Sequence, residues 1–408
     1  EESYRKLIDY YLKDKDAMSE GDKDQLIKPH IFMKYIMDEK FRKFYKGDLP
    51  KQVKEFSFSP FKELYTYQYG ISPRELIRIT GLVNKKRTLF EAILLNYLFQ
   101  FSAPQDLKAA VEVIETAFPG FKEFFARWQK DMTVYFGEKK IDISDTGYNG
   151  FFAPVGSQIG SLKALALSLA GGGQHTLIIS EQGSYPLELI KFFSRVSNCE
   201  LHVFDSNPFT NSLELLGGQM VRFGDFNHAG VAKSTDKLDT VLGFIGMHLA
   251  TEDEYDEKAA KDKPIKILYL SSIETVSSEE LELLNDFLNT GRIKIGGRNY
   301  VLPYNVRIVA ETSVLRKKQF SSPFYNRFQK IGLGAIAAED EVFTYLDKYY
   351  PGLSAEEKTL IYGTTKAAWY LDMGRYDSAY NLEHKKFTYR YGFSMKDVYK
   401  LAELVMLE

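Results

Sequence analysis

Hydroxyl groups and backbone N–H groups gather in one short turn of the sequence, at residues 180–186. Before the turn, residues 176–179 are apolar and largely β-branched, as in a buried parallel strand. After it, residues 187–193 have the apolar spacing of a helix that packs on a sheet. A strand, a tight turn and a helix in this order can bind a phosphate group through backbone N–H groups, so this turn is the first candidate site.

The turn lacks the groups that a nucleotide-binding P-loop uses. The pattern G-x-x-x-x-G-K-[ST] brings backbone N–H groups, a lysine and a hydroxyl to a triphosphate and Mg²⁺. In the same register the sequence has Ser180 and Tyr185 at the two glycines, Pro186 at the lysine and Leu187 at the hydroxyl position, with Gly183 and Ser184 between them. Proline has neither an N–H nor a charge, so we expect weak nucleotide binding or none. An ordinary strand–turn–helix is the alternative interpretation.

Composition limits the classes of function. The 408 residues suggest about two or three domains. The net charge is −2, from 53 basic and 55 acidic residues, so no nucleic-acid partner is expected. No apolar run reaches the ~20 residues of a membrane span, and the single cysteine, Cys199, favours a reducing, cytoplasmic compartment. The six histidines are not spaced as metal ligands are, so we expect no metal site.

The order of predicted elements indicates an α/β protein with helical regions on both sides. Residues 1–144 have amphipathic helical patterns, including a pair of helices over 107–136. Strands are predicted at 176–179, 201–204, 265–270 and 306–310, with a hairpin at 292–302 and a helix near 325–329. Residues 336–408 are again helical, and they end in an apolar helical pattern that suggests a piece of a longer polypeptide.

Two stretches of the sequence repeat one another. Residues 67–83 and 389–405 share two tyrosines, a glycine, a serine, a leucine and a valine at a constant offset of 322 residues. So long a period indicates a repeat of whole modules, and chance similarity between two amphipathic helices is the alternative.

With these motifs the sequence resembles the AAA+ ATPases, in the dynein-related branch that includes dynein heavy chains and midasin. There, each module is a P-loop NTPase-like α/β domain with a parallel sheet, followed by a helical lid that carries a motif like Ser72-Pro73-Arg74-Glu75-Leu76. The resemblance implies that 1–144 is the lid end of a preceding module, 145–335 a degenerate AAA+ domain, and 336–408 its lid. The sequence does not distinguish a dynein heavy chain from midasin. A midasin-like protein would be nuclear.

The resemblance also assigns site positions. Residues 267–270 are similar to the Walker B strand, but Ser271 and Ser272 replace the acidic pair that holds Mg²⁺. Ser313 stands at the sensor 1 position, where asparagine is usual. Residues 322–328 are similar to the helix of the arginine finger, with Arg327 kept, and Lys396 in the second lid corresponds to Arg74. Loss of so many groups at one site implies a pseudo-ATPase module.

A function follows as an expectation from this resemblance. The module would relay conformational change in the ring of a motor protein, with adjacent AAA+ modules of the same polypeptide as its partners. Arg327 and Arg74 would contact the ATP and Mg²⁺ bound by the upstream module, whereas ion-pair or capping roles are their alternatives. A non-motor scaffold that binds proteins, or an active ATPase with an unusual pocket, are the alternative functions.

Overall fold

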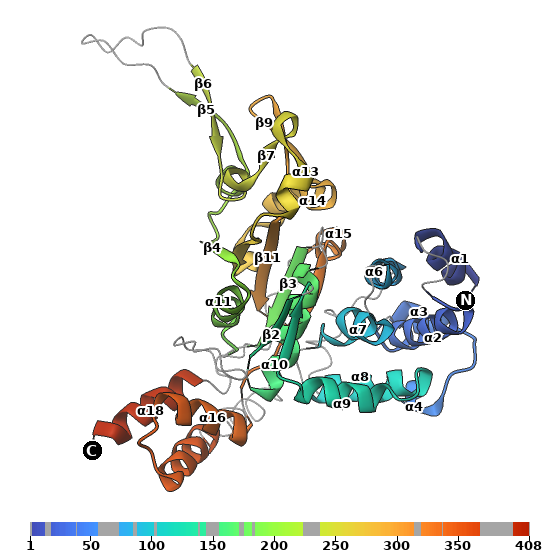
Figure 1. Ribbon diagram of the computed structural model, residues 1–408, viewed down its shortest axis with the longest axis vertical. Coiled ribbons are helices and arrows are strands. Elements are labelled where there is room, and N and C mark those ends of the chain that lie inside the picture. The colour runs from blue at the N-terminus through green and yellow to red at the C-terminus, as the bar shows by residue number, and fades with distance from the viewer. Residues whose placement is uncertain are drawn as a thin grey trace, which may run out of the picture.

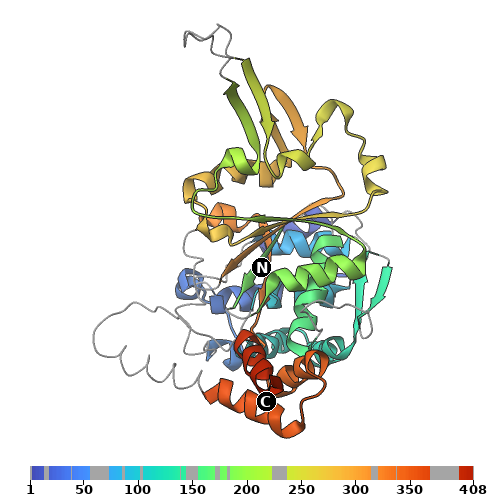
Figure 2. The same ribbon diagram turned by 90° about the vertical axis from the view of Figure 1, so that its left-hand side faces the viewer.

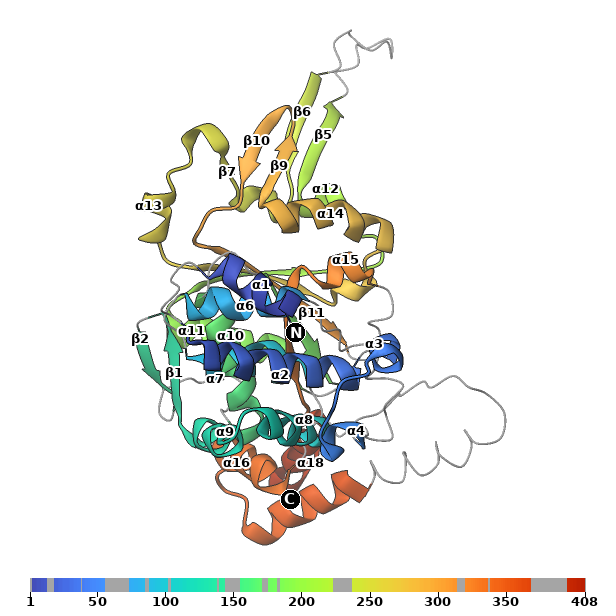
Figure 3. The same ribbon diagram turned by 90° about the vertical axis from the view of Figure 1, so that its right-hand side faces the viewer.

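A computed structural model of the chain places a parallel β-sheet between two sets of helices (Figure 1). The N-terminal helices cover one face of the sheet, and the C-terminal helices lie at one end of the molecule (Figures 1 and 3). The structure describes residues 2–12, 18–37, 39–55, 73–84, 88–101, 104–137, 139–143, 155–170, 175–181, 184–222, 237–313, 320–336, 338–367 and 395–407.

The N-terminal region is helical, as predicted, except at its end. Thr88 begins one of its helices with a capping box, in which its hydroxyl accepts from the Glu91 N–H and the Glu91 carboxylate accepts from the Thr88 N–H. The predicted helical pair over 107–136 is partly wrong, because β-branched and aromatic residues form the first strand of a hairpin there. The elements are α1 (Glu2–Tyr11), α2 (Glu20–Met37), α3 (Glu39–Phe44), α4 (Lys51–Lys54), α6 (Pro73–Val83), α7 (Leu89–Ile93), the π-helix η2 (Leu94–Leu98), α8 (Pro104–Ala117), α9 (Phe121–Lys130), β1 (Thr133–Phe136) and β2 (Lys139–Asp142).

The central sheet has five parallel strands in the order β12-β3-β11-β8-β4. The predicted strands are all present. The runs of β3, β8 and β11 are buried on both faces of the sheet, whereas β4, at its edge, is exposed or half-buried. Helices α10 and α11 share one core with the N-terminal helices on one face of the sheet, and α14 packs on the other face (Figure 1). The elements are α10 (Gly156–Ala170), β3 (His175–Ser180), α11 (Pro186–Ser197), β4 (Glu200–Asp205), β8 (Lys266–Ser271), α14 (Ser278–Thr290), β11 (Val306–Ser313) and β12 (Phe328–Leu333).

The helix expected near residues 325–329 is largely replaced by a strand. A short helix, α15 (Ser322–Tyr325), ends before Arg327, and β12 follows directly. Gln329 and Lys330 interrupt the apolar pattern of β12, so the sequence does not predict a buried strand there, although all six residues of the strand are buried. Gln329 donates from Nε2 to the Leu95 carbonyl at 2.7 Å, which satisfies the amide nitrogen of this buried side chain.

Shorter elements are inserted between the strands and project from one end of the sheet (Figure 2). The predicted hairpin at 292–302 is confirmed, and its turn glycines Gly296 and Gly297 have φ of 58° and 84°, as a type I′ turn requires. Another inserted hairpin, which pairs residues 217–222 with residues 237–242, was not predicted. These elements are α12 (Ser212–Leu215), β5 (Gly217–Arg222), β6 (Lys237–Leu242), η3 (Gly246–His248), β7 (Ala250–Thr251), η4 (Glu252–Glu254), α13 (Glu257–Lys261), η5 (Ile273–Thr275), β9 (Arg292–Ile295) and β10 (Arg298–Val301).

The C-terminal helices form their own small core. They are α16 (Glu339–Tyr349), a helix at 355–367 and α18 (Met395–Leu407). Helices α6 and α18 begin at equivalent positions of the sequence repeat, and both bury the same two positions, Leu76 and Thr80 in α6 and Val398 and Ala402 in α18. The first six residues of each repeat lie outside the described residues.

Candidate functional site

The carboxyl ends of three neighbouring strands meet at one polar cluster. Glu311, near the end of β11, accepts a hydrogen bond from Ser180 Oγ at 2.7 Å and one from the Ser272 backbone N–H at 2.9 Å. Ser180 ends β3, and Ser272 follows β8. Ligands of parallel sheets bind at this edge, so the predicted serines lie where a binding site is expected. The carboxylate of Glu311 now occupies the hydrogen-bonding groups of two of them.

The loop between β3 and α11 has a backbone conformation at Tyr185 that glycine usually adopts. Tyr185 has φ 51° and ψ 60°, the left-handed conformation that glycine adopts without strain. Pro186 is the first helical residue, where it contributes no N–H. The Ser184 side chain is buried and donates to the Glu181 carbonyl at 2.7 Å, while Leu187 is half-buried. Gly183 lies outside the described residues.

Acidic groups also lie beside the ends of β4 and β8. Ser271 Oγ donates to Asp205 Oδ1 at 2.9 Å, and Ser313 lies opposite Ser180 in the sheet register. Glu274 is 3% exposed, and burial, together with the negative charge of Glu311, raises the pKa of its carboxyl group. Among the described residues no group of three or more His, Cys, Asp or Glu side chains can hold a metal ion. The cluster therefore presents negative charge where a nucleotide site presents positive charge.

The loop is connected to the C-terminal helices through one side chain. Gln158, in α10, donates from Nε2 to the Ser184 carbonyl at 3.2 Å. Its Oε1 accepts from the Tyr345 hydroxyl of α16 at 3.4 Å. A movement of α16 can therefore be transmitted to the loop through Gln158.

Arg74 and Arg327 lie close together although they are far apart in the sequence. Arg74 Nη1 is 3.4 Å from the Asn326 carbonyl, and Arg78 Nη2 donates to the same carbonyl at 2.9 Å. Asn326 directly precedes Arg327, so two arginines of α6 meet the predicted finger residue. Arg78 also faces Glu75, with Nη1 and Oε1 3.6 Å apart.

Arg327 is held by neutral partners. Its Nε donates to Asn285 Oδ1 at 2.8 Å and its Nη1 to Asn289 Oδ1 at 2.5 Å, both on α14. Burial, and then the charge of Arg74, lower the pKa of Arg327, which shows that the two like charges interact. The amide oxygens orient the guanidinium without neutralising it, while the negative charges of Asp286 and Glu282 oppose the lowering of its pKa. Lys396 is exposed on α18.

Several of these residues were not predicted to belong to a site. Glu311 directly follows the apolar run at 306–310, and a carboxylate at the end of a buried strand could have been recognised as a candidate site residue. Arg78 follows Arg74 by four residues, so helical spacing places both on one face of α6. Gln158, Asn285 and Asn289 have no sequence signal, because neutral amides acquire their roles only from tertiary contacts.

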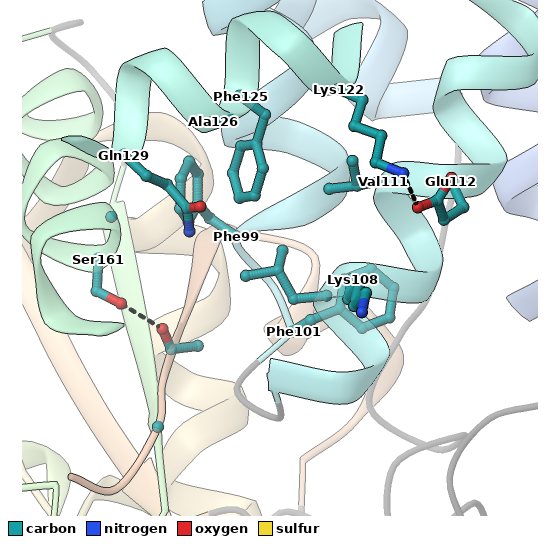
Figure 4. Close-up of a pocket in the computed structure, with 14 residues that line it drawn as sticks. Phe99, Phe101, Lys108, Val111, Glu112, Lys122, Phe125, Ala126, Gln129 and Ser161 are labelled. Carbon is teal, nitrogen blue, oxygen red and sulfur yellow. Dashed lines mark hydrogen bonds and ion pairs between the residues drawn. The ribbon is translucent and has the colours of Figure 1, made fainter. Parts of the chain in front are cut away.

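A cavity of about 350 Å³ lies between the N-terminal helices and the sheet (Figure 4). Apolar side chains, including Phe99, Phe101 and Phe125, form most of its wall, and the Lys122–Glu112 ion pair lies to one side. None of the predicted site residues lines it among the described residues. No described helix is long and apolar enough to span a membrane.

Comparisons with known proteins place the chain in no family. No family model matches the sequence, and no curated protein is significantly similar to it. Among solved structures it is similar to NtrX from Brucella abortus, with 12% identity, a TM-score of 0.28, and coverage of 45% of this chain and 38% of that one. A protein described as a "putative ATPase" from Cytophaga hutchinsonii has 12% identity, a TM-score of 0.29 and coverage of 57% and 54%. The chain thus spans about half or less of these proteins, and neither likeness assigns a function.

Proposed function

We propose that this chain is a non-hydrolysing AAA+-like module of a multi-module ATPase, of the dynein-related kind. Its own nucleotide site is inert, and its arginines act on ATP and Mg²⁺ bound by the module upstream. The observation that carries this proposal is the position of Arg74 beside Arg327, because Arg74 Nη1 contacts the carbonyl of Asn326, the residue that precedes Arg327. The two cations come from distant segments, Arg74 from α6 and Arg327 from the turn before β12, and the charge of Arg74 acts on Arg327.

The inertness follows from charge and from missing donors. A triphosphate needs cations and N–H groups, and here Pro186 supplies neither. The Glu311 carboxylate stands between the ends of β3 and β8, where it would repel a phosphate at short range. The hydroxyl of Ser271 donates to Asp205 and cannot replace a carboxylate in holding Mg²⁺.

A relay role is supported by the contacts between the loop and the helices around it. Gln158 joins the Ser184 carbonyl to Tyr345, so the C-terminal helices and the degenerate loop move as one unit while these hydrogen bonds persist. On the other side, Arg78 joins α6 to Asn326. A displacement of either set of helices thus has a direct route into the sheet.

The ATPase rate of a polypeptide that contains this chain and the module before it tests the proposal. Arg327→Ala should lower kcat by about 10³-fold or more, as loss of an arginine finger does. Asn289→Ala removes one support of Arg327 but keeps its charge, and it should cost far less. An unchanged kcat in Arg327→Ala would favour a scaffold that binds proteins without a catalytic neighbour.

Titration of the chain alone with a fluorescent ATP analogue and Mg²⁺ tests the inert site separately. We expect no binding at micromolar nucleotide. Tight binding would instead favour an active ATPase with an unusual pocket, whatever the effect of Arg327→Ala on the longer polypeptide.

A further inference from the structure

A small pocket lies at the opposite edge of the sheet from the strand-end cluster. Its volume is about 150 Å³, and it lies beside the first residues of β11, the C-terminal end of α10 and the helix α13. Arg307, the second residue of β11, forms its inner wall, and Lys261 and Lys263 line it from α13 and the residues that follow. The pocket is therefore separate from the degenerate nucleotide loop.

Arg307 is a buried cation that has no acidic partner among the described residues. Its residue is 3% exposed, and its Nε donates to the Leu169 carbonyl at 2.8 Å. Its Nη1 donates to the carbonyls of Tyr304 and Val306. Burial lowers the pKa of Arg307, and the groups whose charges oppose that shift are Tyr304, Cys199 and Tyr255, none of them a carboxylate. Neutral carbonyls satisfy its donors but do not cancel its charge.

The two lysines add positive charge at the same pocket. The Tyr304 ring lies near both kinds of cation, with its centroid 5.1 Å from Lys261 Nζ and 5.3 Å from Arg307 Cζ. Lys261 forms an exposed ion pair with Glu257 at 2.7 Å, and Lys263 has no ion pair among the described residues. No described residue that lines the pocket is acidic.

Part of this arrangement has a structural explanation. Arg307 bonds a carbonyl in the last turn of α10, where a cation is favoured by the helix dipole. A capping role accounts for Arg307 Nε, but it does not account for two exposed lysines that line the same pocket. An anion in the pocket would compensate the charges of Arg307 and Lys263 and would add to the Glu257 carboxylate as a partner of Lys261.

We propose that this pocket binds a small oxyanion, a phosphate group in chemical terms, with Arg307 as the buried anchor and the two lysines at the entrance. The volume equals that of about five water molecules, enough for a tetrahedral anion but not for a nucleoside triphosphate. Free phosphate and the phosphate of a monoester share this chemistry. The site extends the protein's anion chemistry beyond the arginine cluster of the proposed function.

Calorimetric titration of the chain with inorganic phosphate, at ionic strength held constant with chloride, tests the site. The variant Lys261→Gln/Lys263→Gln should weaken binding by about tenfold or more, because it removes two charge-assisted contacts. Lys258→Gln is the matched control: Lys258 is exposed on the same helix but does not line the pocket, and its affinity should equal that of the parent. Both variants keep Arg307 and hence the capping of α10.

Two further outcomes are informative. Parallel titration with glycerol phosphate separates the sources, since tighter binding than that of inorganic phosphate identifies a monoester as the ligand. Phosphate affinity that falls in Arg327→Ala but not in the double lysine variant would overturn the proposal, because the anion would then bind at the arginine cluster. Absence of phosphate binding by the parent chain would overturn it as well, and Arg307 would be a helix cap alone.

Discussion

Glu311 accepts a hydrogen bond from Ser180 Oγ at 2.7 Å and thereby joins the end of β11 to the end of β3. Its second oxygen accepts from the Ser272 backbone N–H, so the same carboxylate also fixes the turn after β8. Ser272 has φ 47°, a strained conformation for a residue with a side chain. One acidic side chain thus stabilises the edge of the sheet that carries the candidate site.

Replacement of Glu311 should therefore reduce stability. Glu311→Gln keeps one carbonyl oxygen and loses one of two acceptors, so we expect a loss of about 1–3 kcal/mol in the free energy of unfolding. Urea denaturation monitored by circular dichroism measures it. Glu356→Gln, an exposed carboxylate on the helix at 355–367, serves as the control and should stay within about 0.5 kcal/mol of the parent.

Restoration of nucleotide binding should require removal of this charge. Pro186→Lys with Leu187→Thr supplies the missing ammonium and hydroxyl, but Glu311 remains next to the phosphate position. Adding Glu311→Gln to the double variant should tighten binding of a fluorescent ATP analogue by about tenfold or more. The double variant combined with Glu356→Gln is the control. Equal affinity in the two triple variants would mean that Glu311 does not act on the phosphate.

Tyr185 should tolerate glycine better than alanine. A residue with a Cβ pays about 1–2 kcal/mol in the left-handed conformation, and glycine does not. Tyr185→Gly should hence be more stable than Tyr185→Ala by about 1 kcal/mol in thermal or urea unfolding. The comparison removes the same aromatic side chain in both variants, so the difference reports the backbone alone. Greater stability of the alanine variant would contradict the observed conformation.

Lys330 should make stability rise with pH in the mildly alkaline range. Burial lowers its pKa to about 8 in the folded protein, below the ordinary 10.5 that it regains on unfolding. Between these values the unfolded chain binds more protons, so the free energy of unfolding increases with pH. Urea unfolding at pH 7.5 and about 9.5 should show a steeper increase for the parent than for Lys330→Met.

Lys400→Met, an exposed position on α18, controls for loss of a lysine and should keep the parent slope. Lys163, whose pKa burial also lowers to about 8, is present in all three proteins, so the difference between slopes isolates Lys330. Parallel slopes for the parent and Lys330→Met would show that Lys330 titrates normally in the folded state.

Sequence patterns predicted most of the sheet because its strands carry unbroken apolar runs. The runs at 176–179, 265–270 and 306–310 could only be stabilised by burial on both faces. The pattern failed at β12, where Gln329 and Lys330 look solvated in the sequence. Partners from elsewhere in the chain hold both side chains: the Gln329 amide nitrogen donates to the Leu95 carbonyl, and Lys330 Nζ lies 4.2 Å from the centroid of the Tyr325 ring.

The site was predicted unevenly for a related reason. Residues that replace a motif, such as Pro186 and Ser271, are visible because the expected residue is missing. Residues that interact with these replaced positions are not visible in the sequence. Glu311, for example, acquires its role only from the pairing of β11 with β3 and β8. Arg327 shows the same limit. The sequence indicated an arginine at the finger position, but it did not predict that two asparagines of α14 orient the guanidinium.

The hydrogen bond from Gln329 to the Leu95 carbonyl spans 234 residues, and the Gly332 N–H donates nearby to the Phe99 carbonyl. These contacts close the outer edge of β12 with a segment that leaves the ribosome long before the strand itself. Until β12 is synthesised, residues 95–99 have no sheet to bond, and β3 has an open edge during the same interval. Completion of the sheet is hence a late, long-range event, which predicts slow folding for so large a separation and exposes a partly made chain to edge-to-edge association.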